Sequence, residues 1–408
     1  MGSVPIFLRV TLPFLAGYFV SYIYRSINAI IGPELAREFE LSAAGLGLLS
    51  GIYFFSFALF QLPLGVLLDR YGPRRVNATL LMVAAAGGLW FSLAGSTVQL
   101  TLARAVIGLG VSGCLMASFS AFALWYPAER LATMNGIAFA SGMLGAIMVT
   151  VPLEFVLRVL HWREVFYGIV GLTVAASLVL FTVVPEKVSA RRAVPLPDQL
   201  REFASLARDP AFWRMALCIG SSQLTAVSLG TLWVATWLRD VAGFTQAEVA
   251  QALLLFNLAM IAGYLGFGRV SDRMTRQGRS TLPLLVGGVA AASLCLGLLV
   301  LGVRSGAIAL WCAFFCFTTA VVLSYSLFSR RYPKEMAGRV NSALNVAVFI
   351  GMFSGQWAVG LALSLWPQTA IGYAPEAYGW ALGGLWLVQA AGLAWLWAGR
   401  HLFSRSSA

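Results

Sequence analysis

The chain has 408 residues, of which 59% are hydrophobic and only 11% charged, and its mean hydropathy is +0.81. Charged residues make up about a quarter of an average soluble chain, so this composition excludes a soluble protein. The formal net charge of +12 would suggest nucleic-acid binding in a soluble domain. Here the basic residues lie between apolar stretches, where they determine membrane topology instead. We therefore expect the lipid bilayer as a partner and no nucleic acid.

Apolar segments long enough to cross a bilayer follow one another along the chain. Separated by charged or Pro/Gly-rich breaks, they cover approximately residues 8–33, 43–68, 76–95, 99–125, 131–158, 165–184, 212–238, 246–268, 281–302, 306–329, 338–364 and 378–399. The first segment is long and has no small-residue cleavage site, so we expect a retained helix and not a signal peptide. The sequence predicts an all-α polytopic membrane protein with twelve transmembrane helices.

A single long polar interval divides the twelve segments into two groups of six. We expect an N-terminal bundle at 1–184, a cytoplasmic linker at 185–211 and a C-terminal bundle at 212–408. With the N-terminus inside, 21 of the 28 Lys and Arg residues fall on the cytoplasmic side and five on the outer side. This asymmetry predicts that both termini are cytoplasmic.

The two halves repeat each other at a nearly constant offset. The run that starts at Gly65 and ends in Asp69-Arg70 returns as Gly268 to Asp272-Arg273, 203 positions later. Residues 125–135 return as residues 331–341, with Tyr, Pro, Glu and Asn in register. Two repeated six-helix halves with a site between them near the midplane are typical of alternating-access transporters.

On these features the chain resembles a major facilitator superfamily transporter over essentially its whole length. The most specific element is the loop between spans 2 and 3, which contains Gly65, Asp69, Arg70, Gly72, Arg74 and Arg75. The second copy contains Gly268, Asp272 and Arg273. In this copy two extra residues separate Asp272-Arg273 from the next glycine, Gly278. The glycine-proline motif of family antiporters is not matched in span 5, which argues against drug efflux.

The resemblance implies that the two loops gate the cytoplasmic side. Gly65 and Gly72 would permit close helix approach and a turn with positive φ. Asp69 would accept hydrogen bonds at the start of span 11, and Asp272 would do the same at the start of span 5. The alternative is that these basic loops merely fix the orientation in the membrane.

Span 1 carries a charged residue inside an apolar segment, which is a functional hypothesis by default. Tyr18, Tyr22 and Arg25 are spaced i, i+4, i+7 and share one helix face, with Asn28 a turn beyond. A guanidinium flanked by phenols suits a carboxylate or phosphate. The run is similar to span 1 of organic-anion and organophosphate members of the superfamily, which implies that Arg25 binds the anionic group. The alternative is that Arg25 snorkels outward.

The second half supplies a less charged surface. From its polar and aromatic residues we select candidates for the cavity, namely Gln223, Trp233, Tyr325 and Asn345. The repeat offset places Ser228 opposite Arg25, where organophosphate transporters usually present a second basic residue. The absence of a basic residue at this position favours a singly charged or partly apolar anion such as a monocarboxylate.

Arg104 in span 4 and Glu154 in span 5 are the candidates for proton coupling. Burial would raise the pKa of Glu154 and make it protonatable. Arg104 is expected to pair with Glu34 or Glu154. A static ion pair of Glu154 with Arg104 or Arg158 is the alternative, so coupling to protons stays open.

Nothing in the sequence indicates an enzyme, a cofactor or a metal site. The two histidines, His161 and His401, are expected on opposite faces of the membrane, and the five cysteines lie in apolar segments. We expect a monomeric inner-membrane transporter for a small organic anion. The alternatives are an efflux pump for a hydrophobic drug or metabolite, and a transporter-like receptor that binds its ligand without moving it.

Overall fold

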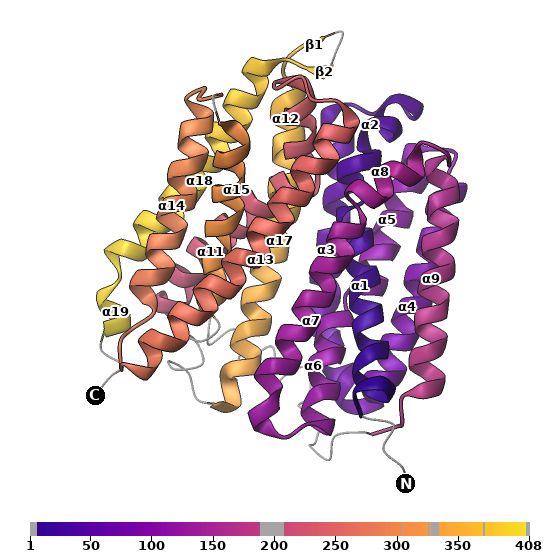
Figure 1. The fold of residues 1–408 in the computed structure, drawn as a ribbon, viewed down its shortest axis with the longest axis vertical. Helices are drawn as coiled ribbons and strands as arrows, with labels where there is room; N and C mark the ends of the chain where they lie inside the picture. Colours follow the sequence, from indigo (N-terminus) through magenta and orange to yellow (C-terminus); the bar gives the residue numbers. More distant parts are fainter. Residues whose placement is uncertain are drawn as a thin grey trace. The chain divides into compact units, whose positions relative to one another are not determined.

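The computed structural model describes residues 6–187, 208–304, 306–324, 327, 334–369 and 372–404. The chain divides into two compact units, the first formed by residues 1–41 and 48–196 and the second by residues 42–47 and 197–408. The helices of both units are shown in Figure 1. Helices prevail because a backbone in lipid has no water to bond and must satisfy its own N–H and C=O groups. Most of the predicted linker, residues 188–207, lies outside the described residues.

The first unit is built from long helices that run up and down. In chain order its elements are η1 (Phe7–Thr11), α1 (Leu12–Ser26), α2 (Asn28–Glu38), α3 (Ala43–Tyr71), α4 (Pro73–Leu93), α5 (Thr97–Val111), α6 (Cys114–Trp125), α7 (Ala128–Met148), α8 (Val151–Leu157) and α9 (Trp162–Val183). Between α1 and α2 only Ile27 intervenes, and its φ of −58° and ψ of −32° are helical. Arg25 therefore lies well inside a nearly continuous helical run.

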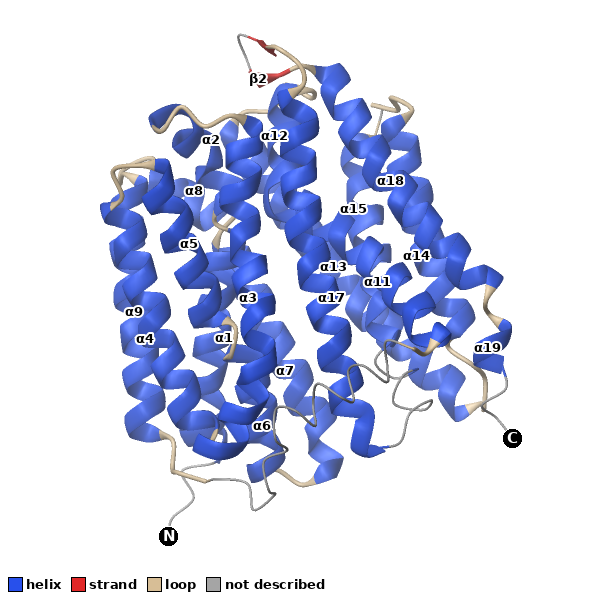
Figure 2. Ribbon diagram, turned by 180° about the vertical axis from the view of Figure 1, so that it is seen from behind, coloured by secondary structure: helices blue, strands red, loops and turns tan. Residues whose placement is uncertain are grey.

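Glycines set the contacts between helices in the first unit. Helix α4 packs against α5 and α9, and α1 packs against α7 (Figures 1 and 2). A Cβ atom at Gly87 of α4 would lie 2.8 Å from the backbone nitrogen of Ile107 in α5, and one at Gly110 of α5 would overlap Ala84. Such close approach of backbones is how helices associate in a membrane, where no hydrophobic effect drives them together.

The second unit is again helical, with one small hairpin. Its elements are α11 (Pro210–Ser228), η2 (Leu229–Trp233), α12 (Val234–Asp240), α13 (Gln246–Arg276), α14 (Leu282–Val300), α15 (Ala307–Thr318), η3 (Thr319–Val322), α17 (Lys334–Ser364), β1 (Gln368–Thr369), β2 (Gly372–Tyr373), α18 (Pro375–Ala398) and α19 (His401–Ser404). Helix α11 packs against α17 and α18, and α14 packs against α15 and α18. The strands are antiparallel, with Gln368 opposite Tyr373. The segment η2 is a π-helical turn that joins α11 to α12.

The predicted fold class is confirmed. Eleven helices among the described residues are long and apolar enough to span a membrane, and the shorter apolar helix Ala307–Val322 corresponds to the remaining predicted segment. The largest difference is α13, which runs to Arg276 although its predicted apolar segment ends at residue 268. Its last two turns are basic, so hydropathy misses them while the helix continues.

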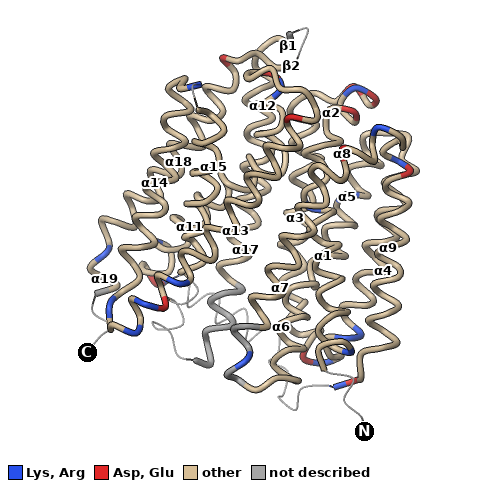
Figure 3. Tube along the Cα trace, viewed as in Figure 1, with Lys and Arg blue, Asp and Glu red and all other residues tan. Residues whose placement is uncertain are grey.

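Charged residues gather near the ends of the helices within each unit (Figure 3). Every Asp and Glu among the described residues lies in a loop or within about one turn of a helix end. Arg104, by contrast, is the middle residue of α5. The five cysteines are free thiols; Cys114, Cys218 and Cys295 are buried, and the other two are half-buried.

Candidate functional site

Arg25 is held over aromatic rings in the first unit. Its Cζ atom lies 4.7 Å from the ring centre of Tyr22, 5.9 Å from that of Phe54 and 5.8 Å from that of Phe57. A ring face attracts a guanidinium within about 6 Å, through its quadrupole. Because Tyr22 belongs to α1 and both phenylalanines belong to α3, these contacts fix the guanidinium between the two helices.

The predicted face of α1 is confirmed. The rings of Tyr18 and Tyr22 meet edge to face with centres 5.1 Å apart, and the Tyr18 hydroxyl donates to the Tyr22 hydroxyl at 3.4 Å. Tyr18 is buried, while Tyr22 and Arg25 are half-buried. A Cβ atom at Gly142 of α7 would lie 2.7 Å from Cε1 of Tyr18 and 2.8 Å from Cε2 of Tyr22. Glycine at this position gives the two tyrosines their room.

Tyr53 of α3 connects two guanidinium groups and was not among the predicted site residues. Its side chain is fully buried, and its hydroxyl donates to the Ser21 carbonyl at 3.3 Å. Arg25 hydrogen bonds to the same phenol, and the Cζ atom of Arg104 lies 5.0 Å from the ring centre. Two cations therefore share one tyrosine.

The expected pairing of Arg104 with Glu34 or Glu154 is wrong. Glu154 is bound by Arg158 through two hydrogen bonds of 3.0 Å, which is the static alternative left open by the sequence. Glu34 instead faces His161, with 3.4 Å between Oε1 and Nε2. Glu154 and Arg158 are four residues apart in sequence, so they meet within one turn without help from tertiary packing.

Asn28 has a partner inside the protein. Its side-chain amide nitrogen donates to the hydroxyl of Ser50 at 2.8 Å, and both residues are buried. The amide oxygen of Asn28 has no hydrogen-bond partner among the described residues. This polar pair ties the start of α2 to α3, one turn from Tyr53.

The candidates in the second unit differ in their surroundings. Trp233 is fully buried, and its indole nitrogen donates to the backbone carbonyl of Gln356 at 3.0 Å. Gln223 on α11 and Asn345 on α17 are half-buried. Tyr325 lies outside the described residues. Trp233 thus joins η2 to α17 within the core of this unit.

Asp240 is a half-buried polar anchor that the sequence analysis missed. It accepts a hydrogen bond from the Tyr378 hydroxyl at 2.6 Å and from the Tyr373 backbone nitrogen at 3.1 Å. Burial, followed by the negative charge of Asp240, raises the pKa of Tyr373 to about 12. Gly372 has a φ of 149°, and a Cβ atom there would strike the Asp240 carboxylate. The carboxylate therefore fixes the hairpin to α12 and α18.

Of the two glycines in the first loop, Gly72 makes the expected turn and Gly65 does not make the expected close approach, while the gating role of the loop stays a prediction. Gly72 precedes α4 with a φ of 80°, as expected for a tight turn. A Cβ atom at Gly65 would meet nothing within 4 Å, so the close helix approach predicted there is wrong. Arg74 and Arg75 both bind the carboxylate of Glu186, at 3.3 and 3.1 Å. These arginines therefore anchor the chain where it leaves α9.

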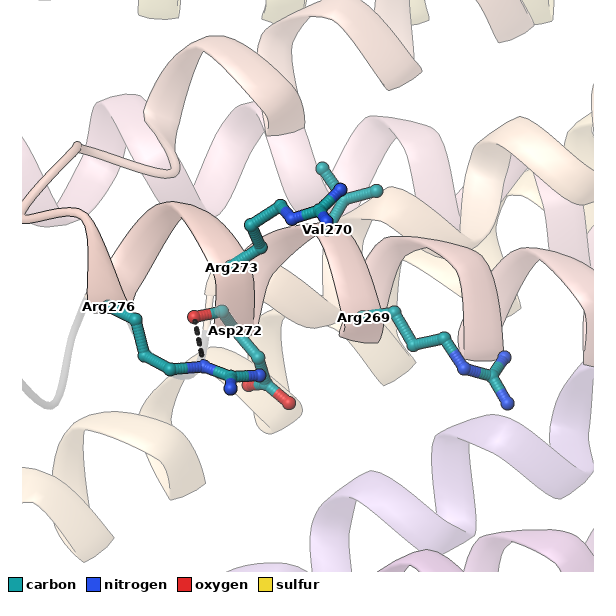
Figure 4. Close-up of a pocket in the computed structure, with 5 residues that line it drawn as sticks. All are labelled: Arg269, Val270, Asp272, Arg273 and Arg276. Carbon is teal, nitrogen blue, oxygen red and sulfur yellow. Dashed lines mark hydrogen bonds between the residues drawn. The ribbon is translucent and has the colours of Figure 1, made fainter.

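Asp69 and Arg70 occupy the last turn of α3, and the second loop places its charges in the last turns of α13. A surface pocket there is lined by Arg269, Val270, Asp272, Arg273 and Arg276 (Figure 4). The Arg276 side chain donates to the Asp272 carbonyl at 3.4 Å. At Gly268 a Cβ atom would again meet open space. The contacts expected of Asp69 and Asp272 with spans 11 and 5 stay predictions.

Residues 14–356 match the sequence profile of the Major Facilitator Superfamily. The chain belongs to this superfamily. Membership makes it a multi-pass membrane transporter and not an enzyme, and the apolar helices of both units agree with that.

Among curated relatives, a probable sulfoacetate transporter of Cupriavidus necator is 24% identical over 280 residues. This chain spans 64% of that relative's length, and the alignment covers 64% of this chain. A D-galactonate transporter of Escherichia coli is 23% identical, with 89% of this chain and 87% of the relative covered. The comparisons give no support to the efflux alternative.

Solved structures of superfamily members share the fold. A bacterial homologue of the human lysosomal transporter Spinster superposes with a TM-score of 0.81 at 19% identity, covering 99% of both chains. A D-xylose–proton symporter superposes with a TM-score of 0.75 at 16% identity, covering 96% of this chain and 97% of the other. At these identities the likeness concerns the fold alone.

Proposed function

We propose that this superfamily member is a secondary active transporter that moves a small organic anion across the inner membrane by alternating access. The observation that carries the proposal is the position of Arg25, with its guanidinium over three aromatic rings inside the first unit. Aromatic rings hold a cation in place without cancelling its charge. A planar guanidinium then binds a carboxylate through two parallel hydrogen bonds.

The names of the relatives support this substrate class. Sulfoacetate and D-galactonate are both small organic anions, and both names belong to relatives found by sequence. In the proposal Tyr18, Tyr22 and Asn28 complete the site around Arg25. Residues of the second unit, Gln223, Trp233, Tyr325 and Asn345, line the cavity on their side.

The remaining parts of the proposal concern the transport cycle. Both termini are cytoplasmic, the protein works as a monomer, and the loops of Asp69 and Asp272 close the cytoplasmic side. Proton coupling would use Glu154, whose two hydrogen bonds to Arg158 would have to open for the carboxyl group to titrate.

Ligand-induced thermal stabilisation tests the substrate class. The purified protein, Arg25→Ala and the exposed control Arg37→Gln are heated with monocarboxylates, dicarboxylates, sugar phosphates or lipophilic cations. A ligand at about 100 times its Kd stabilises the folded state by about 2.7 kcal/mol. We expect an anion to raise the Tm of the wild type and of Arg37→Gln, and to leave that of Arg25→Ala unchanged.

Two results would contradict the proposal. Stabilisation by lipophilic cations that persists in Arg25→Ala would make Arg25 structural and favour the efflux alternative. An anion that binds but crosses no membrane in proteoliposome flux measurements would instead favour a receptor.

A further inference from the structure

A row of aromatic rings continues from Arg25 across three helices of the first unit. The ring of Tyr22, which contacts the Arg25 guanidinium, meets the ring of Tyr18 edge to face with centres 5.1 Å apart. The Tyr18 ring meets that of Phe139 with centres 6.5 Å apart, and the Phe139 ring meets that of Phe119 at 5.8 Å, again edge to face. We call these four side chains, Tyr22, Tyr18, Phe139 and Phe119, the aromatic row.

The aromatic row is assembled by α1, α6 and α7, which pack against one another (Figures 1 and 2). Both tyrosines lie on α1, Phe139 lies on α7 and Phe119 lies on α6. Edge-to-face contacts place the positive edge of one ring against the negative face of the next, which favours one mutual arrangement of the rings. The row is therefore a built surface and not a set of independent side chains.

Part of the aromatic row is open, beginning at Arg25. Phe139 is 38% exposed, and Tyr22, Phe119 and Arg25 itself are half-buried. A charged side chain inside a span faces the interior of the bundle or water and not lipid. A ligand that reaches the Arg25 guanidinium from this side therefore also reaches the rings that follow it.

The serines next to the aromatic row in sequence offer little to a polar ligand. Ser21, Ser118 and Ser141 each donate to a backbone carbonyl of their own helix, at 2.7, 2.6 and 2.8 Å. A hydroxyl group has a single proton to donate, and the Tyr18 phenol donates its own to Tyr22. A ligand rich in hydroxyl groups thus meets rings here, together with hydroxyls whose protons are already bonded.

We propose that the anion bound at Arg25 is an aromatic carboxylate, with its carboxylate on the guanidinium and its ring against the aromatic row. This inference rests on the proposed function and names its substrate class. A further ring extends an edge-to-face array without burying a polar group. A hydroxyl group buried there without a partner would instead cost free energy.

This assignment narrows the monocarboxylate expected from the sequence, and it separates this chain from its D-galactonate-transporting relative. Phe139 and Phe119 are specificity-determining residues, because they lie beyond Tyr18 and contact the ring of the substrate and not its charge. Arg25 remains the residue that binds the carboxylate.

Monocarboxylates of equal charge that differ in the rest of the molecule test the inference. The probes are benzoate, cyclohexanecarboxylate, acetate and D-galactonate. Their Kd values are measured by calorimetry on the purified full-length wild type, Phe139→Leu, Arg25→Ala and the control Phe155→Leu. Phe155 is a matched control because it lies on α8, outside the aromatic row, and is 66% exposed.

We expect the wild type to bind benzoate roughly tenfold or more tightly than acetate or D-galactonate, because burial of the ring adds to the affinity. Benzoate should also bind roughly two- to tenfold more tightly than cyclohexanecarboxylate, the factor that an aromatic contact adds to burial. Phe139→Leu should bring benzoate down to the affinity of cyclohexanecarboxylate, and Phe155→Leu should behave as the wild type. Arg25→Ala should lose all binding.

Three results would overturn this inference and leave the proposed function intact, provided that binding is lost in Arg25→Ala. The first is D-galactonate binding to the wild type as tightly as benzoate. The second is equal affinity of the wild type for benzoate and cyclohexanecarboxylate, and the third is an unchanged preference for benzoate in Phe139→Leu. The first two need no variant of Phe139 to fold. Absence of any anion binding that depends on Arg25 would overturn the proposed function itself.

Discussion

Glu38, the last residue of α2, accepts hydrogen bonds from two side chains at the start of α9. The Trp162 indole nitrogen donates to Oε2 at 2.8 Å, and the Arg163 guanidinium donates to Oε1. Burial alone would raise the pKa of Glu38, but these bonds and the charges of Arg163 and His161 outweigh it. The pKa of Glu38 therefore lies below its usual value of 4.5.

This depressed pKa predicts how stability depends on pH. Because the folded state holds Glu38 ionised, the carboxylate contributes its stability above about pH 4.5, and this contribution is lost as the pH falls through the folded-state pKa. We expect the Tm of the wild type to fall more steeply below about pH 4.5 than that of Glu38→Gln, measured by scanning fluorimetry in detergent. The exposed neighbour variant Glu40→Gln should behave as the wild type. Equal slopes in the wild type and Glu38→Gln would contradict the assignment.

At the scale of the helices, close approach of α1 and α7 positions the candidate site. A Cβ atom at Gly145 would overlap the backbone carbonyl of Phe19, and one at Gly142 would press on both tyrosines of the α1 face. These are the glycines of span 5 that fail to match the antiporter motif. Their role here is to let α7 support the rings next to Arg25.

Substitution of Gly142 should therefore reduce the affinity for the anion more than it reduces the stability of the folded protein. In Gly142→Ala the added methyl group would meet the rings of Tyr18 and Tyr22 at less than 3 Å and displace them. We expect anion affinity to fall by roughly tenfold, with a loss of unfolding free energy within the usual range of about 0.5–3 kcal/mol for single substitutions. Gly168→Ala on α9 is the matched control, since a Cβ atom there meets nothing within 4 Å. Unchanged affinity in Gly142→Ala would show that the rings need no such support.

At the scale of the whole molecule, the distribution of basic residues predicts which end of each helix faces the cytoplasm. The ends of α9 differ in this respect, because Val159 precedes it on the side with few basic residues and Lys187 follows it on the side with many. Labelling from either side of the membrane tests this predicted orientation.

Single cysteines at these two positions should react from opposite sides. In a parent whose five native cysteines are replaced, we expect a membrane-impermeant maleimide to label Val159→Cys in intact cells and Lys187→Cys only after permeabilisation. Val159 is 81% exposed, so its labelling is not limited by burial. Labelling of Lys187→Cys in intact cells would reverse the predicted orientation.

The spans and the α1 face could be predicted because each depends on local pattern. Segment length and the i, i+4, i+7 spacing specify them without knowledge of tertiary contacts. Tyr53 could not be found that way, since its link to Arg25 and Arg104 requires three helices to meet. The role of Asp240 could not be predicted either, because its partners Tyr373 and Tyr378 lie more than 130 residues away in the sequence.

For ion pairs too, only the local contacts could be predicted from the sequence. The pair of Glu154 with Arg158 was recognisable as an alternative because it lies within one helical turn. That Arg104 forms no ion pair with a carboxylate of the described residues could not be predicted, because a sequence gives the charged residues of a span but not their neighbours in space.

The π-helical turn η2 has a consequence for how this chain tolerates insertions and deletions. A π turn contains one more residue than an α turn. The side chains after η2 therefore point in the directions they would have if one residue of η2 were removed and the helix were regular α-helix. Removing Gly230 would thus convert η2 into regular α-helix and leave Asp240 pointing at its two tyrosines. The same removal in the middle of α11 would rotate everything after it by about 100° and pull that anchor away. Natural length variants of this helix should therefore cluster at residues 229–233.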